Sequence, residues 1–238
     1  MTSPAEVLVQ LRTQHPTSPR LTWYGPDLVE RIELSGRVLD NWVAKAANML
    51  LEEFDAGPGT QVGLDLPAGH WRSAYWALGT WAVGATLVLA PSPSQVVDVL
   101  ITSHPEPDSV PALIVVTPAA LARRYPGELP AGALDEAAEL ATYGDELDPP
   151  DSPGPRSSAL VEPGNEISYA ELVPTDAPAG RVHLPAAIPV GSGLRRALGV
   201  WAAGGSIVVT PASGPVSGHP ATAVADILAR EGITAGDS

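Results

Sequence analysis

Residues 77–91 read ALGTWAVGATLVLAP, and residues 197–211 read ALGVWAAGGSIVVTP. Eight of these fifteen positions are identical at an offset of 120 residues, including Trp81 and Trp201. Each copy joins the end of an amphipathic helix to a glycine and then to a strand of small and β-branched residues. A chance likeness between segments rich in alanine, glycine and valine is the alternative explanation. We favour true internal symmetry, in which two units pack about a pseudo-twofold axis around a shared core.

Helix and strand patterns alternate along the rest of the chain, with short connections between them. Ser3, Pro4 and Glu6 form a capping box that begins a helix ending near Gln14. The other expected segments are hairpin strands over 21–24 and 30–34, a helix over 35–54 stopped by Gly57-Pro58, strands over 61–66, 86–90 and 112–117, a short helix over 94–103, a second hairpin strand and helix start over 166–172, a strand over 181–189, and a helix opening at 191–193. The apolar face of the long helix is predicted to contain Val38, Leu39, Trp42, Ala46, Met49 and Leu50. This order predicts a layered α/β domain with two pseudo-symmetric halves.

A shift in composition marks the best candidate for a domain boundary. The stretch TYGDELDPPDSPGPR, residues 142–156, is rich in proline and acidic residues. We therefore predict a first α/β subdomain over 1–142, a connection over 143–157 and a partial second α/β subdomain over 158–238, which can form one compact unit.

Composition excludes several classes of function. The chain has 27 acidic and 13 basic residues, a net charge of −14, which would repel a phosphate backbone and argues against a nucleic-acid partner. With no cysteine, neither a disulfide framework nor a thiolate nucleophile is available. The N-terminus has no signal-peptide pattern. The uncharged run from Ser73 to Val97 is divided by glycines and a proline, which favours a buried helix and strand over a membrane span. We expect a cytoplasmic protein.

With this layout, residues 31–89 and the stretch from about Ser158 to Ala235 resemble the N-terminal part of the adenylate-forming enzymes, which include acyl-CoA synthetases and peptide-synthetase adenylation domains. The resemblance lies in a pattern of helices and strands. It implies two N-terminal subdomains related by pseudo-symmetry, in agreement with the repeat. The chain matches only about the first third to half of such an enzyme, so we expect a short, truncated relative.

The phosphate loop of that family does not carry over. Members of the family hold ATP with a loop of the form T-S-G-T-T-G-x-P-K, in which backbone N–H groups cradle the phosphates. At the matching place this chain reads SALVEPGNEISYAEL, residues 158–172. The loop is reduced to Glu162, Pro163, Gly164, Asn165 and Glu166. Two carboxylates stand where phosphate oxygens would sit, and such a loop would repel ATP.

The lysine content supports the same expectation. The resemblance implies one lysine in the phosphate loop and another in a C-terminal domain, whereas Lys45 is the only lysine of this chain. Lys45 falls in the middle of the long helix, where we expect a solvated side chain. The sequence also ends near the start of the family's next strand, so we expect no adenine-binding motifs, metal-binding acid or C-terminal domain. We predict no catalytic residues and no cofactor.

Two loops remain as candidate ligand sites. Gly191, Ser192 and Gly193 lie between a strand and a helix N-terminus and are followed by Arg195, an arrangement that suits an anion. Gly69 and Arg72 occupy the matching loop of the first copy. The two loops would border one crevice if both lie at the carboxyl ends of their strands. The alternative is a pair of tight turns with solvated arginines, because a lone G-x-G is a weak signal.

Other patterns carry little chemistry. The five histidines show no metal-ligand spacing, so no metal site is predicted. His183 lies near a family histidine but several residues out of register, and no role is transferred. The acidic residues 52, 53, 55, 145, 146 and 148 flank turns and indicate solvated faces.

These observations lead to three functional hypotheses. The first is a catalytically inactive relative of the adenylate-forming enzymes that binds an acyl or nucleotide-like small molecule or acts in regulation. The second is a protein-interaction or homodimerisation module without a small ligand. The third is residual acyl-adenylate or CoA-ligase activity.

Overall fold

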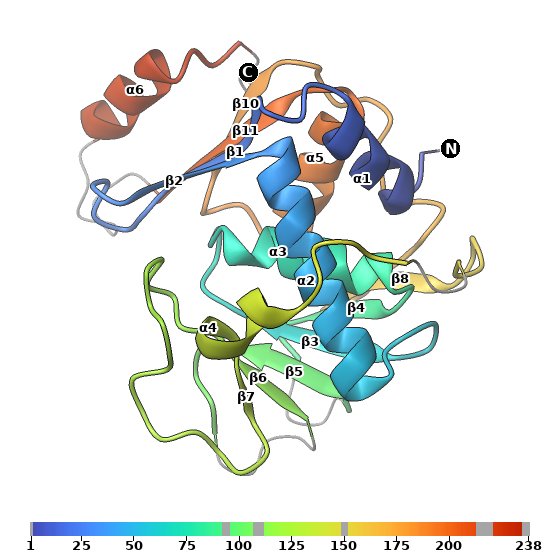
Figure 1. The fold of residues 1–238 in the computed structure, drawn as a ribbon. Helices are drawn as coiled ribbons and strands as arrows, with labels where there is room; N and C mark the ends of the chain where they lie inside the picture. The colour runs from blue at the N-terminus through green and yellow to red at the C-terminus, as the bar shows by residue number, and fades with distance from the viewer. Residues whose placement is uncertain (1, 92–95, 107–111, 149–151, 213–220, 235–238) are drawn as a thin grey trace.

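The computed structural model describes residues 2–91, 96–106, 112–148, 152–212 and 221–234. Two β-sheets lie on opposite sides of a layer of helices (Figure 1). The four-stranded sheet has the order β10 (Arg181–Pro185), β11 (Ser206–Thr210), β1 (Pro19–Tyr24) and β2 (Arg31–Ser35). The seven-stranded sheet has the order β7 (Leu134–Asp135), β6 (Leu113–Val115), β5 (Val99–Thr102), β3 (Gln61–Asp65), β4 (Thr86–Leu89), β8 (Ser158–Glu162) and β9 (Asn165–Ser168). The predicted layered α/β fold is confirmed.

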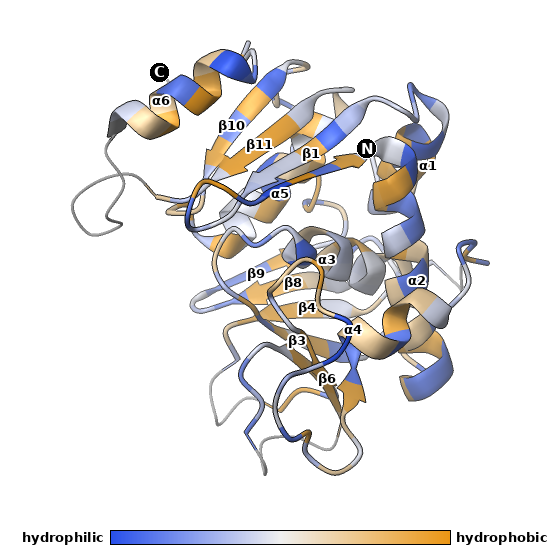
Figure 2. Cartoon of the chain, turned by 60° about the vertical axis from the view of Figure 1, so that its left-hand side comes forward, coloured by the Kyte–Doolittle hydropathy of each residue, from blue (hydrophilic) through white to orange (hydrophobic). Residues whose placement is uncertain are grey.

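Four helices form the middle layer, α1 (Pro4–Thr13), α2 (Gly36–Phe54), α3 (Arg72–Ala82) and α5 (Val190–Ala202). Trp76, Trp201 and Tyr75 are the largest of the fully buried side chains, and all three come from α3 and α5. Hydrophobic residues also dominate the central strands of both sheets (Figure 2). The core therefore lies between the two sheets, around α3 and α5. Among the described residues, no helix combines the length and the apolar character that a membrane span requires.

The sequence repeat corresponds to two βαβ units, β3–α3–β4 and β10–α5–β11. In the first unit Gln61 pairs with Thr86, and in the second Arg181 pairs with Ser206, so the offset of 120 residues holds for both strands. Two residues after the end of each helix comes a glycine with a φ of +80°, Gly84 or Gly204, a conformation that favours glycine. The two units belong to different sheets.

A β-hairpin extends each unit in the same way. Hairpin β8–β9 lies beside β4, with Leu160 opposite Leu87, and hairpin β1–β2 lies beside β11, with Leu21 opposite Ile207. Both hairpins carry a register shift one residue before the paired leucine. Each sheet therefore combines strands from both sides of the connection over 143–157, and the two predicted subdomains share their sheets.

Two local predictions need correction. The short helix expected over 94–103 is wrong, because residues 99–102 form β5, which pairs through its backbone with β3 and β6, while residues 94 and 95 lie outside the described residues. The long helix ends at Phe54 as predicted, and its C-cap is Asp55, which adopts a left-handed conformation with a φ of +49° ahead of Gly57-Pro58. Val38 does not belong to the buried face of α2, since 41% of it is exposed.

Lys45 is likewise not a solvated helix residue, because its side chain is only 16% exposed. Its ammonium group donates to the carbonyl oxygens of Ala141 at 3.1 Å and Tyr143 at 2.6 Å, and it forms an ion pair with Asp145 at 2.5 Å. The chain from the 3₁₀ turn Leu140–Thr142, which follows α4 (Glu136–Glu139), to Asp145 lies against α2 and supplies these three partners. Lys45 thus fastens the connection to the helix layer.

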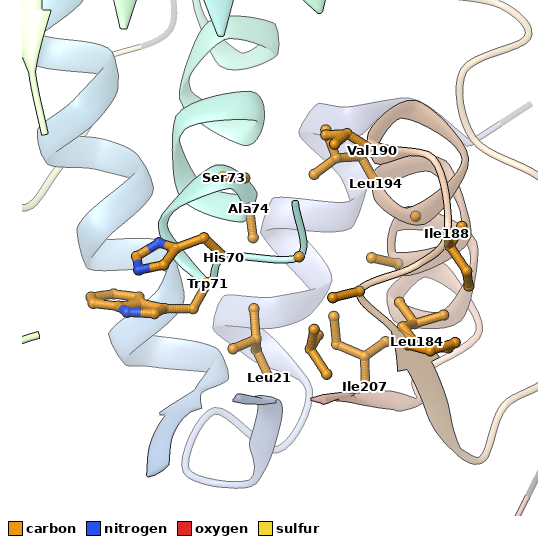
Figure 3. Close-up of a pocket in the computed structure, with 16 residues that line it drawn as sticks. Leu21, His70, Trp71, Ser73, Ala74, Leu184, Ile188, Val190, Leu194 and Ile207 are labelled. Atoms are coloured by element: carbon orange, nitrogen blue, oxygen red, sulfur yellow. The ribbon is translucent and has the colours of Figure 1, made fainter. Parts of the chain in front are cut away.

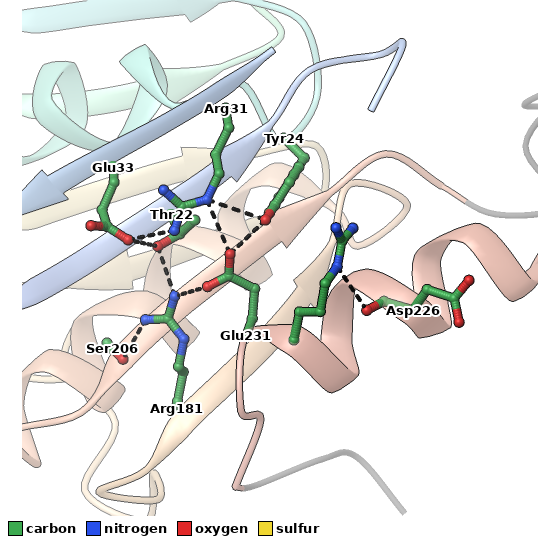
Figure 4. A network of polar contacts seen from close by, with 9 residues as sticks. Thr22, Tyr24, Arg31, Glu33, Arg181, Ser206, Asp226 and Glu231 are labelled. Carbon is green, nitrogen blue, oxygen red and sulfur yellow. Dashed lines mark hydrogen bonds and ion pairs between the residues drawn. The ribbon is translucent and has the colours of Figure 1, made fainter. Parts of the chain in front are cut away.

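Helix α6 (Ala221–Arg230) lies beside the four-stranded sheet, away from the middle layer (Figure 1). Glu231, directly after α6, accepts hydrogen bonds from Tyr24, Arg31 and Arg181 (Figure 4). The Arg31 Nε to Glu231 Oε1 distance is 3.0 Å. This cluster fastens α6 to strands β1, β2 and β10.

Candidate ligand cavity between the two βαβ units

The loops that precede α3 and α5 meet where the two βαβ units join. Gly69 has a φ of +68°, and a Cβ atom at this position would lie 2.6 Å from the Cβ atom and 2.9 Å from the Cα atom of Ala186. Only glycine permits so close an approach in this conformation. The loops predicted to border one crevice are therefore in direct contact, and the space between the units is a small cavity behind that contact.

This inter-unit cavity has a volume of about 60 Å³. Its wall is almost entirely apolar (Figure 3), and side chains of β1, β10, β11, α3 and α5 contribute to it. The labelled apolar side chains are Leu21, Trp71, Ala74, Leu184, Ile188, Val190, Leu194 and Ile207. The chemistry of this wall suits an aliphatic group and offers no charge to a phosphate.

His70 and Ser73 are the two lining residues with polar side chains, and the His70 ring points away from the aliphatic side chains of the wall (Figure 3). Its Nδ1 atom accepts a hydrogen bond from the backbone N–H of Arg72 at 3.3 Å, so the proton resides on Nε2, which donates to the carbonyl oxygen of Pro118 at 3.1 Å. Burial, together with the nearby Arg72 charge, lowers the pKa of His70 to about 4. His70 is a neutral imidazole whose proton points toward the Pro118 carbonyl.

A second pocket, of about 210 Å³, adjoins the first and shares Ser73 and Val190 with it. It lies at the carboxyl ends of β3, β4 and β8, the edge at which open α/β sheets bind ligands. Asp65 and Glu162 contribute carboxylates to its wall. One carboxylate oxygen of Asp65 accepts a hydrogen bond from Thr102 Oγ1 at 3.0 Å. Negative charge thus faces this pocket.

The segment at the phosphate-loop position is a tight hairpin turn. Pro163 and Gly164 join β8 to β9, and Gly164 has a φ of +76°. Glu166 and Asn165 are exposed, whereas Glu162 is half-buried and accepts a hydrogen bond from the Asn165 amide at 3.0 Å. Only Pro163 and Gly164 separate the two strands at this position.

Glu162 lies against the first turn of α5. A Cβ atom on Gly191 would lie 2.3 Å from Glu162 Oε2, so the carboxylate packs directly on the glycine. No side chain caps this helix N-terminus, where the helix dipole favours negative charge. The protein's own carboxylate therefore stands at the place where the sequence predicted an external anion.

The remaining predicted ligand residues have other surroundings. Gly193 lines the inter-unit cavity, and Ser192 is exposed on the outside of α5. Arg195 donates to the backbone carbonyl oxygens of Glu171 at 2.8 Å and Leu172 at 3.3 Å. The structure brings Gly69, Gly191 and Gly193 to the same junction, and their role in ligand binding stays a prediction.

Arg72 is buried in a polar cluster that the sequence did not indicate. It forms an ion pair with Glu136 at 3.2 Å, donates to Tyr75 and stacks over Trp71 with its guanidinium carbon 4.4 Å from the ring centre. Tyr75 also donates to Glu136. Burial raises the pKa of Glu136, against the lowering effect of Arg72. Among the described residues, no group of three or more histidine, aspartate or glutamate side chains is arranged to hold a metal ion.

The fold defined by these two sheets and their helix layer is that of the N-terminal domain of adenylate-forming enzymes. An acyl-CoA synthetase of Brucella canis superposes with a TM-score of 0.70 at 18% identity, over 97% of this chain and 46% of that one. The N-terminal domain of FACL13 from Mycobacterium tuberculosis gives 0.70 at 15% identity, over 100% and 63%. The N-terminal subdomain of NpsA from Klebsiella oxytoca gives 0.67 at 13% identity, over 99% and 60%. The resemblance expected from the sequence is confirmed at the level of fold.

Among curated proteins, a "TIGR03089 family protein" of Mycobacterium tuberculosis (strain ATCC 25618 / H37Rv) is 38% identical over 146 residues. The alignment covers 59% of this chain and 60% of that relative, so the chain spans only part of the proteins that it resembles. No protein-family model matches the sequence.

Proposed function

We propose that this protein is a non-catalytic relative of the adenylate-forming enzymes that binds the aliphatic part of an acyl compound in the cavity between its two βαβ units. The observation that carries the proposal is the wall of that cavity, which is apolar apart from Ser73 and His70. His70 is neutral, and its Nε2–H group already donates a hydrogen bond to the carbonyl oxygen of Pro118. An aliphatic group leaving water for such a wall gains about 0.8 kcal/mol per methylene buried. With a volume of about 60 Å³, the cavity suits a short chain.

The absence of ATP chemistry is supported by the electrostatics of the neighbouring pocket. Asp65 and Glu162 face the space at the carboxyl ends of the strands, and Glu162 covers the α5 N-terminus. Two carboxylates there would repel a triphosphate. Lys45 cannot compensate, because its charge is already paired with Asp145. Pyrophosphate exchange dependent on ATP is therefore expected to be absent, and its presence would favour residual ligase activity instead.

The test measures the melting temperature in the presence of acetate, butanoate, hexanoate and hexanoyl-CoA, with AMP and CoA for comparison. A ligand at about a hundred times its dissociation constant adds about 2.7 kcal/mol to the free energy of unfolding. We expect stabilisation that grows with acyl chain length until the cavity is full, beyond any constant effect of the charged groups, which acetate, AMP and CoA measure. Equal melting temperatures across the acyl series would contradict the proposal.

A matched pair of variants on α5 locates the effect. Ala197 lines the cavity, whereas Ala202 is a half-buried residue of the same helix that does not. Ala197→Val fills part of the cavity and is expected to abolish the stabilisation by hexanoate, while Ala202→Val adds the same volume elsewhere and should retain it. Loss of the stabilisation in both variants would argue against this cavity as the binding site.

The interaction hypothesis gives a different result in the same samples. Strands β2 and β9 each end a sheet, and β9 presents Asn165 and Glu166 to solvent. Such an edge can pair with a second chain unless charge discourages it. A dimeric mass in light scattering together with no response to any acyl compound would favour a homodimerisation module.

A further inference from the structure

A separate pocket lies at the N-terminal ends of strands β1, β10 and β11 of the four-stranded sheet. Its volume is about 280 Å³. The lining residues are His15, Ser18, Pro19, Arg20, Ala179, Gly180, Arg181, Gly204, Gly205, Ser206 and Thr234. The inter-unit cavity contacts the other ends of the same strands, through Leu184, Pro185 and Val209. The pocket and the inter-unit cavity therefore lie toward opposite ends of these strands.

Arg20 places a buried charge in the wall of this pocket. Only 5% of the residue is exposed. Its guanidinium donates to the carbonyl oxygens of Gly204, Gly205 and Gln14, and the distances to Gly205 and Gln14 are 2.9 and 2.6 Å. Its buried Nε atom has no hydrogen-bond partner. Carbonyl oxygens satisfy hydrogen bonds but carry no net charge, so the guanidinium lacks a counter-ion among the described residues.

The rest of the pocket is basic or neutral, although the protein as a whole carries a net charge of −14. Arg181 and His15 line it with three hydroxyl groups, and none of the lining residues is acidic. Arg181 donates to Ser206 Oγ at 3.2 Å, and its own counter-ion is Glu231, which is not part of the wall (Figure 4). Burial lowers the pKa of Arg20, because its charge has lost water without gaining a carboxylate. A bound anion would offset that cost.

The other βαβ unit shows that the fold does not require this arrangement. The residue equivalent to Arg20 is Ala159, since the indoles of Trp201 and Trp81 donate to the backbone carbonyls of these two residues. Around Gly84 the space is filled, with atoms of Pro58 and Pro153 each 3.2 Å from the position of a Cβ atom. At Gly204 nothing lies within 4 Å of that position. A buried arginine beside an open pocket is thus a property of one half alone.

We propose that this pocket is an anion site, in which Arg20 provides the counter-charge for a phosphate or carboxylate group of a small molecule. Ser18, Ser206 and Thr234 would supply hydrogen bonds to its oxygens, and Arg181 and His15 complete a basic rim. The site is independent of the acyl cavity, so either can fail without the other.

The probe is inorganic phosphate, with acetate as the carboxylate arm at matched ionic strength, followed through the backbone amide signals of Gly204, Gly205 and Ser206 by NMR. We expect saturable shifts of these signals, and the arm that saturates at lower concentration identifies the preferred anion. Arg20→Met should weaken binding tenfold or more, since a hydrogen bond to a charged group contributes about 1.5–3 kcal/mol. The absence of saturable shifts with both anions would overturn the proposal.

A second pair of variants keeps the test decisive if Arg20→Met does not fold. Ser18 is exposed and lines the pocket, whereas its neighbour Thr17 is exposed outside it. Ser18→Asp places a carboxylate at the rim and is expected to compete with phosphate, weakening its binding tenfold or more. Thr17→Asp changes the net charge equally and should bind phosphate as the unmodified protein does. Equal weakening in both variants would show a general charge effect and would also overturn the proposal.

Discussion

Trp81 and Trp201 occupy the same position in the two βαβ units and make the same hydrogen bond. The indole N–H of Trp81 donates to the carbonyl oxygen of Ala159 at 2.8 Å, and that of Trp201 donates to the carbonyl oxygen of Arg20 at 2.9 Å. In both cases the acceptor belongs to the first strand of the hairpin that extends the sheet. Each tryptophan therefore fastens a helix to a strand from a distant part of the chain.

This equivalence predicts similar costs for Trp81→Phe and Trp201→Phe. Each change leaves a buried carbonyl oxygen without its donor, which costs about 1–3 kcal/mol, and adds a small cavity. Urea unfolding at constant m-value measures the two costs. A large loss in one variant and none in the other would mean that the two halves do not depend on the shared bond.

A comparison of two glycines separates backbone strain from steric contact. Gly69 and Gly164 have φ values of +68° and +76°, but only Gly69 faces a neighbour, Ala186, whereas nothing lies within 4 Å of the Cβ position at Gly164. Gly164→Ala should destabilise by about 1–2 kcal/mol, the cost of a side chain in this region. Gly69→Ala should add a further ~1–3 kcal/mol of overpacking. Equal free energies of unfolding in the two variants would argue against the contact between the loops.

The βαβ units can be predicted from the sequence because their patterns are local. The helix over 72–82, its terminal glycine and the β-branched strand that follows are adjacent in the chain, and the same pattern over 190–210 supports the assignment. The pairing of each hairpin with a strand from a distant part of the chain could not be predicted in this way. Leu21 and Ile207, for example, become neighbours only when β1 pairs with β11 in the folded protein. The error over 94–103 has the same origin. The local sequence favours a helix there, but pairing with the parallel strands β3 and β6 stabilises residues 99–102 as a strand.

The candidate site is predictable to a smaller extent. Gly69, Gly191 and Gly193 could be placed at one junction, because loops at the ends of equivalent strands meet in a symmetric fold. The surroundings of Arg72 could not, because its partner Glu136 is 64 residues away in a four-residue helix with no strong pattern. The apolar cavity wall also left no distinct signal, since aliphatic residues of β10 and α5 read as ordinary core.

His70 predicts a loss of stability in mildly acidic solution. Burial lowers its pKa from 6.5 to about 4 in the folded protein, so the unfolded chain takes up the proton first. The contribution of neutral His70 to the free energy of unfolding is fully present above about pH 6.5 and is lost as the pH falls toward 4. Urea unfolding from pH 7 to 4 should show this slope, and His70→Asn should flatten it. An unchanged slope in that variant would assign the effect to another group.

Glu231 predicts a second loss at lower pH. Burial opposes its ionisation, but hydrogen bonds from Tyr24, Arg181 and Arg31 outweigh burial and lower the pKa of Glu231 from 4.5 to about 2. Because the folded-state pKa is lowered, ionised Glu231 adds to the free energy of unfolding above about pH 4.5, and this contribution disappears as the pH falls toward 2. The shift corresponds to up to about 3 kcal/mol.

The test of this second window is a comparison of two glutamates that contact the same arginine. Glu231 is 10% exposed and joins α6 to the sheet, whereas Glu33, 35% exposed, forms an ion pair with Arg31 at 2.6 Å near the surface. Glu231→Gln should lower the free energy of unfolding at neutral pH and remove its dependence on pH between 4.5 and 2. Glu33→Gln should cost at most about 1 kcal/mol, as exposed ion pairs do. Hydrogen exchange of the α6 amides measures the same contact locally: faster exchange in Glu231→Gln alone supports a clasp between α6 and the sheet, and equal exchange in both variants contradicts it.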